Sequence, residues 1–583
     1  MEYIWNILEQ GNEEDTNRIV DILNIDRTLA GLLAQRGITN FDDAKTFFRP
    51  ELIQLHNPFL MKDMDKAVER LEKAILNKEK ILIYGDYDVD GTTSVALIYS
   101  FLRKFKVNAG YYIPDRYIEG YGISLEGINY AEKNNFSLVI ALDCGIKAVK
   151  KIEIAKGKNI DFIICDHHTP GEKIPDAYAV LDPKREDCPY PYKELSGCGV
   201  GFKLIQAFTM HSNPLDFSTA TKREINKVLH QELAKYLDYV TVSIASDIVP
   251  ITGENRILTY FGLKQLNKNP CTGLQAIMKI SGVEEKQITV SDLVFKVGPR
   301  INAAGRIQKG FMAVKLLICQ DEEEAMRLGE EINNYNAIRK DLDQSITEEA
   351  LQLIETNAAI KNKRTTVLFN RDWHKGVIGI VASRLTETYY RPTVILTESR
   401  GMATGSARSV IGFDLYSAIS NCSDLLEAFG GHKYAAGLTM KIENVENFTE
   451  KFEKIVTKNI QPEQLYPQID IDAQIHFRDI TPKFYRILKQ FAPFGPENMK
   501  PIFLSTNVHD SGGSRIVGAS NEHLRLELTQ GNISINGIGF GLAKYLSLVK
   551  SGKAFKICYT IEENDFRGVV SLQLVVKDIK PQD

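Results

Sequence analysis

The chain has 583 residues, of which 44% are hydrophobic and 25% are charged. At ~100–200 residues per domain, this length predicts three or four domains. The 71 basic and 75 acidic residues give a net charge of −4, so a polyanionic ligand would need a local basic surface. The eight cysteines form no C-x-x-C pair, which disfavours a disulfide framework or a zinc ribbon. Without a signal-peptide pattern or an apolar run of ~20 residues, we expect a cytoplasmic protein with no membrane segment.

Residues 1–60 are expected to form a short, mostly helical lead-in. Between residues 61 and 311, short apolar runs alternate with amphipathic, helix-like segments. The runs at 81–84, 138–142 and 162–165 each stop at an acidic residue or just before one. Continuous apolar strands separated by helices are typical of a doubly wound, parallel α/β sheet.

Three further segments follow this α/β domain. Residues 312–357 are charge-rich with few helix breakers, which predicts a long connecting helix. Residues 358–460 have the pattern of a second, smaller α/β domain. After Gln461-Pro462 the sequence changes to alternating strands with turn signals, so we expect 465–583 to form a small β-barrel.

Three carboxylates stand two residues apart where the first predicted strand ends, at Asp86, Asp88 and Asp90. In extended geometry, alternate residues face the same side, so we expect the three groups to lie close together. Like charges at such distances repel one another unless a cation lies among them. The alternative is an exposed acidic turn that ends at Asp90-Gly91, and this loop alone favours neither interpretation.

The two other strands favour a site. Asp143 follows the second strand, and Asp166, His167 and His168 follow the third. The carboxyl ends of parallel strands form the ligand crevice of an open α/β sheet. Oxygen-rich ligation with an imidazole suits Mn²⁺ or Mg²⁺ better than zinc. An acidic cluster of this kind can hold two ions, which predicts metal-assisted hydrolysis of a phosphoester.

In order and spacing, these segments resemble the first three motifs of the DHH phosphoesterase superfamily, and 237–250 resembles the fourth. By this resemblance, five side chains hold two Mn²⁺ or Mg²⁺ ions: Asp88, Asp90, Asp143, His167 and Asp247. Asp86 and Asp166 would act behind these ligands, and His168 would contact the scissile phosphate. Asp238 is the alternative fourth-motif ligand, and Asp247 would then be an ordinary carboxylate at a helix end. The chain reads Ala-Ser-Asp where Val-Ala-Asp is expected, which leaves the aspartate in place.

Within the superfamily, the chain is most similar to the RecJ family. The similar segments are 113–122, 195–203, 297–306, 373–384, 405–409, 429–437 and 491–498. The resemblance implies a DHH catalytic domain over 61–311, a DHHA1 substrate-binding domain over 358–460 and an OB-like nucleic-acid-binding domain over 465–583. It also implies eight DNA-contacting residues: Arg116, Tyr121, Arg300, Asn302, Arg306, Ser406, Arg408 and His432.

The residue types of this set permit such contacts. A hydroxyl and a guanidinium, as at Ser406 and Arg408, suit a phosphate that backbone amides also hold. An aromatic such as Tyr121 can stack on a base. The alternatives are a strand-to-helix turn with a surface arginine, solvated arginines at 300 and 306, and a core tyrosine.

The resemblance implies a single-stranded-DNA-specific 5′-to-3′ exonuclease that acts in DNA repair and recombination. Its expected partners are single-stranded DNA, a single-strand-binding protein and a RecQ-type helicase, and the expected state is a monomer. The main alternative is an oligoribonuclease or cyclic-dinucleotide phosphodiesterase of the same superfamily. A metal-free scaffold is disfavoured because all five expected ligands are present, and an inorganic pyrophosphatase would not need an OB domain.

Overall fold

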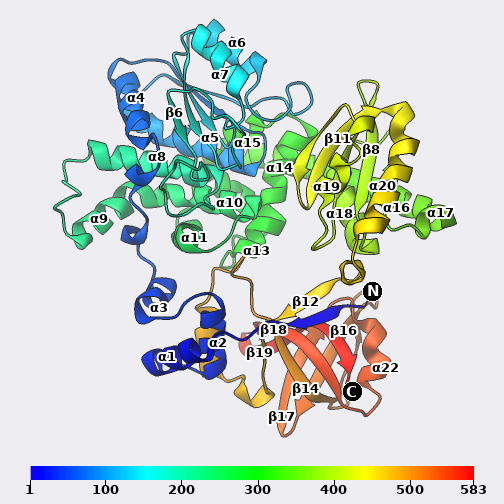
Figure 1. The fold of residues 1–583 in the computed structure, drawn as a ribbon. Helices are drawn as coiled ribbons and strands as arrows, with labels where there is room; N and C mark the ends of the chain where they lie inside the picture. Colours follow the sequence, from blue (N-terminus) through cyan, green and yellow to red (C-terminus); the bar gives the residue numbers. More distant parts are fainter. Residues whose placement is uncertain (1, 567, 583) are drawn as a thin grey trace. The chain divides into compact units, whose positions relative to one another are not determined.

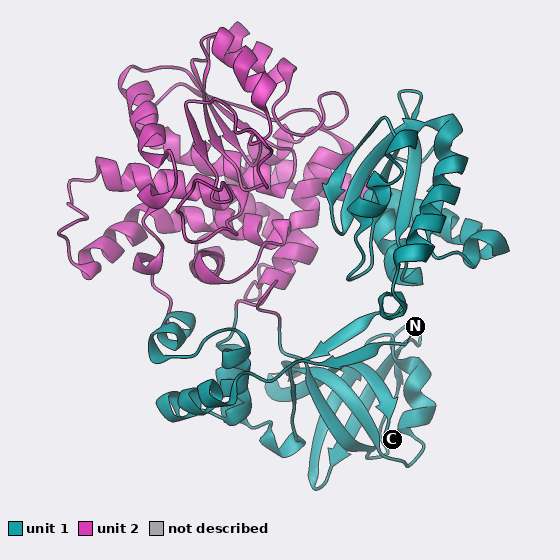
Figure 2. Cartoon of the chain, in the orientation of Figure 1, with its two compact units in different colours: residues 1–48, 342–492, 500–583 teal, residues 49–341, 493–499 magenta. Residues whose placement is uncertain are grey.

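The computed structural model describes residues 2–566 and 568–582. The chain divides into two compact units (Figure 2). One consists of residues 49–341 and 493–499, and the other of residues 1–48, 342–492 and 500–583. The first unit therefore includes a short piece of chain that lies far away in the sequence.

Five parallel strands form the sheet of the first unit, in the order β3-β2-β4-β5-β6 (Figure 1). Their bounds are β2 Ile81–Gly85, β3 Ala109–Tyr112, β4 Leu138–Leu142, β5 Asp161–Cys165 and β6 Ala179–Leu181. In chain order this is a 2-1-3-4-5 arrangement, whose topological switch point lies between β2 and β4. The predicted doubly wound parallel sheet is confirmed.

Alternate residues of each strand pack into opposite layers, as the two-residue period of a strand requires. Ile81 and Ile83 join the core formed with α4, α5 and α8, whereas Leu82 and Tyr84 join the core formed with α6 and α7 (Figure 1). These helices are α4 Met64–Leu76, α5 Val89–Leu102, α6 Leu125–Lys133, α7 Val149–Gly157 and α8 Gly197–Ser212. Because both faces of the sheet are covered, ligands can reach it only at its edges and strand ends.

Several more helices belong to the first unit. They are α9 Lys222–Leu233, α10 Leu237–Asp247, α11 Gly253–Leu266, α12 Thr272–Ile280, α13 Val290–Asp292, α14 Gly298–Ile307 and α15 Phe311–Leu317. The connecting segment is not one helix from residue 312, because α15 ends before α16 begins. Helix α16 then runs over 35 residues, Glu322–Thr356, with Glu322, Glu323 and Glu324 in its first turn. Acidic residues at this position complement the positive end of the helix dipole.

The second unit contains another five-stranded sheet, in the order β10-β11-β9-β8-β7, with only β7 and β8 parallel. Its strands are β7 Thr366–Phe369, β8 Thr393–Ser399, β9 Met402–Arg408, β10 Ala428–His432 and β11 Ala435–Lys441. The helices around it are α17 Ala358–Lys361, α18 Ile378–Tyr389, α19 Leu415–Ser420 and α20 Val445–Asn459. The expected second α/β segment is therefore present.

The C-terminal strands are β13 Ala473–Gln474, β14 Phe503–Asp510, β15 Arg515–Val517, β16 His523–Gln530, β17 Ile533–Gly539, β18 Phe555–Phe566 and β19 Val569–Pro581. Five of them pair in a ring, because β14 bonds to both β18 and β16 while β19 and β17 complete the path between these two. Two short helices, α21 Pro482–Lys489 and α22 Leu546–Val549, accompany them. This is the expected OB-like β domain.

The lead-in is mostly helical, as expected. Its helices are α1 Glu13–Leu23, α2 Arg27–Gln35 and α3 Phe41–Phe48, but it begins with a strand, β1 Ile4–Ile7. Strand β1 pairs in parallel with β12 Gln468–Ile471, and Trp5 Nε1 donates a hydrogen bond of 2.9 Å to Asp578. The N-terminus is thus part of the C-terminal β structure, which a four-residue strand gave no means to predict. Among the helices of the described residues, none is long and apolar enough to cross a membrane.

Candidate active site

The three aspartates after β2 do not lie in one extended segment, contrary to our expectation, because the chain bends after Asp86 and α5 begins at Val89. Asp88 is the N-cap of α5 and its Oδ1 accepts a hydrogen bond of 3.0 Å from Gly91, while Asp90 lies in the first turn of that helix. A Cβ atom at Gly91 would come within 2.5 Å of the Asp86 nitrogen, so glycine lets the helix start against the strand end. The aspartates are gathered by a tight strand-to-helix turn at the switch point of the sheet.

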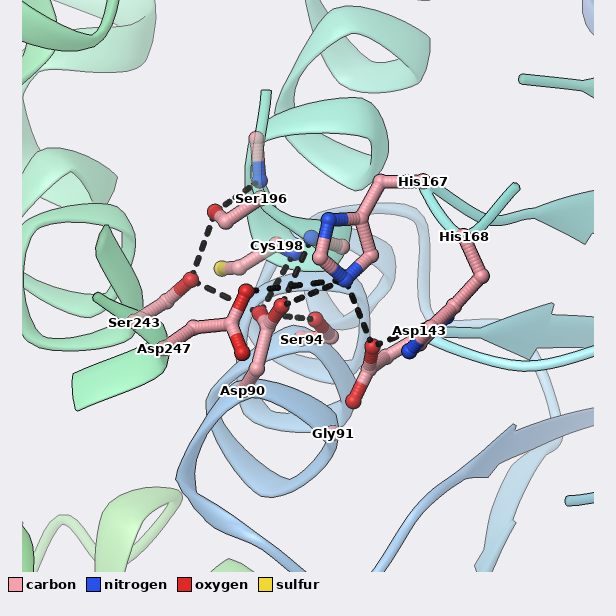
Figure 3. A network of polar contacts seen from close by, with 12 residues as sticks. Asp90, Gly91, Ser94, Asp143, His167, His168, Ser196, Cys198, Ser243 and Asp247 are labelled. Atoms are coloured by element: carbon pink, nitrogen blue, oxygen red, sulfur yellow. Dashed lines mark hydrogen bonds and ion pairs between the residues drawn. The ribbon is translucent and has the colours of Figure 1, made fainter. Parts of the chain in front are cut away.

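The imidazole of His167 is the centre of the acidic cluster (Figure 3). Its Nε2 atom lies 3.2 Å from Asp143 Oδ1, 3.6 Å from Asp90 Oδ2 and 3.6 Å from Asp247 Oδ2. Two groups of side chains therefore have the spacing of metal ligands: Asp143, His167 and His168, and Asp90, His167 and Asp247. The strand ends, the first turn of α5 and the end of α10 bring together side chains that are up to 157 positions apart in the sequence, from Asp90 to Asp247.

The chemistry of these donors fits a divalent cation. Burial lowers the pKa of His167, so its ring is neutral near pH 7. Both of its ring nitrogens are buried and have no hydrogen-bond partner in the described part of the chain. Burial first, and then the neighbouring carboxylates, raise the pKa of Asp143 and of Asp247 well above the usual range. A cation at this point would accept the electron pair of the His167 ring and would offset the repulsion between the carboxylates.

Behind this cluster, Asp166 organises the loop after β5. Its Oδ1 accepts hydrogen bonds from the His167 and His168 amides, and its Oδ2 accepts one of 2.9 Å from Ile146. Oδ1 also lies 2.7 Å from Nδ1 of His168. Burial alone would raise the pKa of Asp166, but the contact with His168 and the amides lowers it to about 2. The same contact outweighs burial at His168 and raises the pKa of its imidazole.

Asp88 and Asp86 have less direct positions. Asp88 belongs to neither of the two groups among the residues that the structure describes. Burial and the charge of Asp90 raise the pKa of Asp88, and burial and Asp88 do the same to Asp86. Burial and the neighbouring charges therefore favour the protonated form of both carboxyl groups.

Of the two fourth-motif aspartates, only Asp247 reaches His167. Asp238 lies in the first turn of α10 and is fully buried. Its two oxygens accept hydrogen bonds of 2.8 Å from the amides of Tyr239 and Cys271. Asp238 thus acts within the core of the unit, and the geometry favours Asp247 as the ligand.

The loop after β3 carries two of the expected DNA-binding residues. Arg116 lies over the ring of Tyr87, 4.8 Å from its centroid. Tyr121 is 51% exposed, and its hydroxyl donates a hydrogen bond of 2.9 Å to the Asp143 carbonyl. The same hydroxyl lies 3.2 Å from Nε2 of His168. Tyr121 is therefore not a core residue, and its hydroxyl contacts both Asp143 and His168 of the acidic cluster.

Helix α14 carries the next three residues, all half-buried: Arg300, Asn302 and Arg306. Arg300 is not simply solvated, because it donates hydrogen bonds to Asn333 and to the Lys296 carbonyl, at 2.9 and 2.7 Å. The carbonyl of Arg306 accepts a hydrogen bond from the Tyr117 hydroxyl, which links α14 to the loop after β3.

In the second unit, Ser406 and Arg408 lie within strand β9 and not in a strand-to-helix turn. Their backbone pairs with β8 and β11 on either side, so the amides belong to the sheet ladder and cannot form the expected amide cradle. Arg408 pairs with Ala435, and Ala435 pairs with His432 on the next strand. Ser406 lies two residues before Arg408 on β9, so the side chains of Ser406, Arg408 and His432 share one face of the sheet. Arg408 Nη1 also donates a hydrogen bond of 2.9 Å to the Ser406 hydroxyl.

Sequence reasoning missed two groups at the first site. Asp182 follows β6 and is fully buried, with an Oδ2 atom that has no hydrogen-bond partner among the described residues. Ser243 lies in the apolar middle of α10, and its hydroxyl is 2.7 Å from Asp90 Oδ1. Asp182 follows a strand, as Asp143 and Asp166 do, so the same pattern could have identified it. That strand, β6, has only three residues and is hard to recognise in the sequence. No sequence signal indicated Ser243.

Three family models match the chain: the DHH family N-terminal domain at 80–242, the DHHA1 domain at 362–458 and the RecJ OB domain at 471–578. The single-stranded-DNA-specific exonuclease RecJ of Bacillus subtilis is 33% identical over 578 residues, which is 98% of this chain and 70% of that protein. The protein of the same name from Escherichia coli is 31% identical over 530 residues, or 89% of this chain and 90% of the relative.

Solved structures agree with these matches. The crystal structure of RecJ in complex with Mn²⁺ from Thermus thermophilus has a TM-score of 0.83 and 24% identity, covering 100% of this chain and 80% of that one. A crystal structure of exonuclease RecJ bound to manganese has a TM-score of 0.57 and 28% identity, covering 69% and 96%. The matched domains and the acidic switch-point crevice define a member of the DHH superfamily that also carries a DHHA1 domain. Because relatives above 30% identity align over most of both chains, this chain belongs to the RecJ family.

Proposed function

We propose that this protein is a metal-dependent exonuclease that hydrolyses the phosphodiester bonds of single-stranded DNA from the 5′ end, in DNA repair and recombination. The observation that carries the proposal is the position of His167 within 3.6 Å of carboxylate oxygens of Asp90, Asp143 and Asp247, at the switch point of a RecJ-family sheet. The relatives named above are single-stranded-DNA-specific exonucleases, which supports the choice of substrate.

Asp90, Asp143, His167 and Asp247, together with Asp88, would hold two Mn²⁺ or Mg²⁺ ions. Two such ions stabilise the attacking and leaving oxygens of an in-line phosphoryl displacement. The carboxylates supply the hard oxygen donors that both metals prefer, and His167 supplies a neutral nitrogen.

His168 is better suited to a phosphate oxygen than to a metal ion. Its Nδ1 is engaged with Asp166 at 2.7 Å, which orients the ring and favours the protonated form. Nε2 then carries a hydrogen that can be donated to the scissile phosphate. Asp166 would act through His168, and Asp86 would act behind the metal ligands.

The DNA strand would contact Arg116 and Tyr121 near the metal ligands, and Arg300, Asn302 and Arg306 on α14. Aromatic stacking on a base is worth ~1–3 kcal/mol and tolerates any sequence, which suits the half-exposed ring of Tyr121.

The 5′ end would be held by Ser406, Arg408 and His432. A Cβ atom at Gly379 would come within 3.0 Å of the Ser406 hydroxyl and 3.1 Å of Arg408 Nη2, so both side chains lie at the first turn of α18. A helix N-terminus attracts anions, and a guanidinium can grip a phosphate with two hydrogen bonds. This combination supports a terminal-phosphate site on the DHHA1 sheet.

We also propose a cytoplasmic monomer in which residues 61–311, 358–460 and 465–583 act as DHH, DHHA1 and OB-like domains. A single-strand-binding protein and a RecQ-type helicase are its proposed partners.

Digestion of singly end-labelled single-stranded DNA with Mn²⁺ or Mg²⁺ tests the proposal. Release of mononucleotides from a 5′ label first, with no cleavage in EDTA and little of duplex DNA or RNA, is the expected result. Preferred cleavage of short RNA or cyclic dinucleotides would support the alternative function, and release from the 3′ label first would contradict the polarity.

A further inference from the structure

The carboxylate of Asp90 is held by donors from two other helices (Figure 3). The amides of Gly197 and Cys198, in the first turn of α8, donate to Oδ2 at 2.7 Å and to Oδ1 at 2.8 Å. The Ser243 hydroxyl, on α10, lies 2.7 Å from Oδ1. Ser94 adds a longer contact of 3.5 Å to the same oxygen. Asp90 is thus fixed by α8 and α10 as well as by its own helix.

The direction of the hydrogen bonds at Ser243 follows from the number of hydrogens. Its Oγ lies 2.7 Å from both Asp90 Oδ1 and Ser196 Oγ, but a hydroxyl carries only one hydrogen. Because an ionised carboxylate can only accept, the single hydrogen of Ser243 is assigned to the bond with Asp90. Ser196 in turn accepts a hydrogen bond of 3.1 Å from the Gly199 amide as the N-cap of α8.

The hydrogen bonds to Asp90 leave one acceptor position of its carboxylate for a metal ion. Each carboxylate oxygen has two acceptor positions. Those of Oδ1 are taken by Cys198 and Ser243, whereas Oδ2 accepts only from Gly197 among these donors. Oδ2 is also the oxygen of Asp90 that lies near His167, whose Nε2 is 3.6 Å away. Asp90 therefore offers a single oxygen, toward His167 and Asp247.

We infer that Ser243 is a positioning residue that makes Asp90 a one-oxygen ligand of the ion shared with His167 and Asp247. This inference rests on the proposed function, since it concerns the same metal ions. Groups that hold a metal ligand from behind fix its orientation, and their removal typically weakens metal affinity 10–100-fold. Without the Ser243 hydroxyl, Oδ1 keeps only one short hydrogen bond, from the Cys198 amide, and Asp90 can rotate away from its single-oxygen geometry.

Ser246 provides a matched control on the same helix. Its hydroxyl is buried and has no hydrogen-bond partner in the part of the chain that the structure describes. Ser243→Ala and Ser246→Ala therefore make the same chemical change on α10, and only the first removes a hydrogen bond to a proposed ligand.

The experiment is a Mn²⁺ titration of the full-length protein, with unbound Mn²⁺ measured by electron paramagnetic resonance. The wild-type protein and the Ser246→Ala variant should each bind two ions, and each site should have the same affinity in both proteins. Ser243→Ala should weaken one of the two sites about tenfold or more and leave the other unchanged. Circular dichroism of each protein checks that the fold is retained.

If Ser243→Ala does not fold, Ser243→Cys keeps a similar shape with a weaker donor and should show a smaller loss at the same site. Wild-type affinity at both sites in a folded Ser243 variant would overturn the inference. Equal weakening at both sites would also overturn it, because Asp90 would then serve both ions. A wild-type protein that binds no Mn²⁺ would reject the proposed function itself, which separates the two failures.

Discussion

Gly197 lies directly against Asp143, so that a Cβ atom on Gly197 would be 2.6 Å from Cβ and 2.9 Å from Cα of Asp143. Asp143 itself has a φ of 57°, in the left-handed region that residues with a Cβ atom seldom adopt. The turn after β4 and the start of α8 therefore fit together only because residue 197 has no side chain. Its amide also donates to Asp90, so one glycine contacts two proposed ligands.

Gly197→Ala should lower both nuclease activity and Mn²⁺ affinity, because the backbone of Asp143 must move. Overpacking of this kind typically costs about 1–3 kcal/mol of stability. Gly199→Ala is the matched control, since a Cβ atom there would meet its neighbours at an ordinary 3.4 Å. Melting temperature, Mn²⁺ binding and activity should be near wild type in Gly199→Ala, and equal effects of the two substitutions would contradict the steric argument.

Asp143→Ala should abolish nuclease activity without unfolding the protein. Burial and the charges of Asp90, Asp88 and Asp247 raise the pKa of Asp143, so its removal relieves repulsion in the metal-free protein. The melting temperature in EDTA should be unchanged or higher. At Mn²⁺ concentrations near 100 times the dissociation constant, the wild-type protein should gain about 2.7 kcal/mol, and the variant should gain much less. Full activity in this variant would reject the metal assignment.

Asp247→Asn should impair metal binding, whereas Asp238→Asn should impair stability. The first substitution removes a charge beside His167, so Mn²⁺ binding and activity should fall. The second alters a carboxylate whose two oxygens accept from the Tyr239 and Cys271 amides, and an asparagine can satisfy only one of them. Asp238→Asn should therefore keep Mn²⁺ affinity but lose about 1–3 kcal/mol of stability. Isothermal titration and thermal melting distinguish the two, and a loss of Mn²⁺ binding in Asp238→Asn would contradict this assignment.

The central sheet was predictable because its strands are continuous apolar runs that end at polar residues. Asp143, Asp166 and His167 were found in this way, since the strand that delivers each of them is visible in the sequence. The turn at Asp86–Asp90 was misread as extended chain because the residues that force the helix start, such as Gly91, act through contacts with the strand end. Periodicity carries no information on such contacts.

Other features depend on partners that lie far away in the sequence. Strand β1 pairs with residues more than 460 positions later, since Ile4 is the partner of Gln468. In the sequence alone, its four residues cannot be told from the end of a helix. Ser243 reads as one small residue on an apolar helix, and its role appears only when α10 packs beside α5 and α8. Long-range packing of this kind decides the site, and a single sequence does not display it.

Asp182→Asn should change how stability depends on pH. Burial raises the pKa of Asp182 to about 7, whereas an unfolded aspartate has a pKa of about 3.9. Between these values the folded state keeps the proton and the unfolded state loses it, so the contribution of Asp182 to stability decreases as pH rises from about 4 to about 7. Below this window both states are protonated, and above it both are ionised, so the penalty is constant.

The asparagine variant cannot ionise and lacks this contribution. Its stability relative to wild type should therefore rise by about 1.4 kcal/mol per pH unit at most across the window. Urea unfolding in EDTA at pH 4.5, 6 and 8 measures the difference, and other titrating groups cancel because both proteins share them. A difference in unfolding free energy that stays constant with pH would show that Asp182 is already ionised at pH 4.5.

Arg408→Ala should distinguish substrates by their 5′ end. If Ser406 and Arg408 hold a terminal phosphate beside the first turn of α18, the loss of the guanidinium should weaken binding of 5′-phosphorylated DNA more than that of 5′-hydroxyl DNA. Hydrogen bonds to charged groups contribute about 1.5–3 kcal/mol, which corresponds to roughly a 10–150-fold increase in KM for the phosphorylated strand. Arg371→Ala is the control, because Arg371 is an exposed arginine of the same unit that pairs with Glu398 at 3.4 Å. The measurement is steady-state digestion of matched oligonucleotides that differ only at the 5′ end. Equal losses on both substrates would show that Arg408 contacts an internal phosphate or supports the strand, and the terminal-phosphate site would then have to be abandoned.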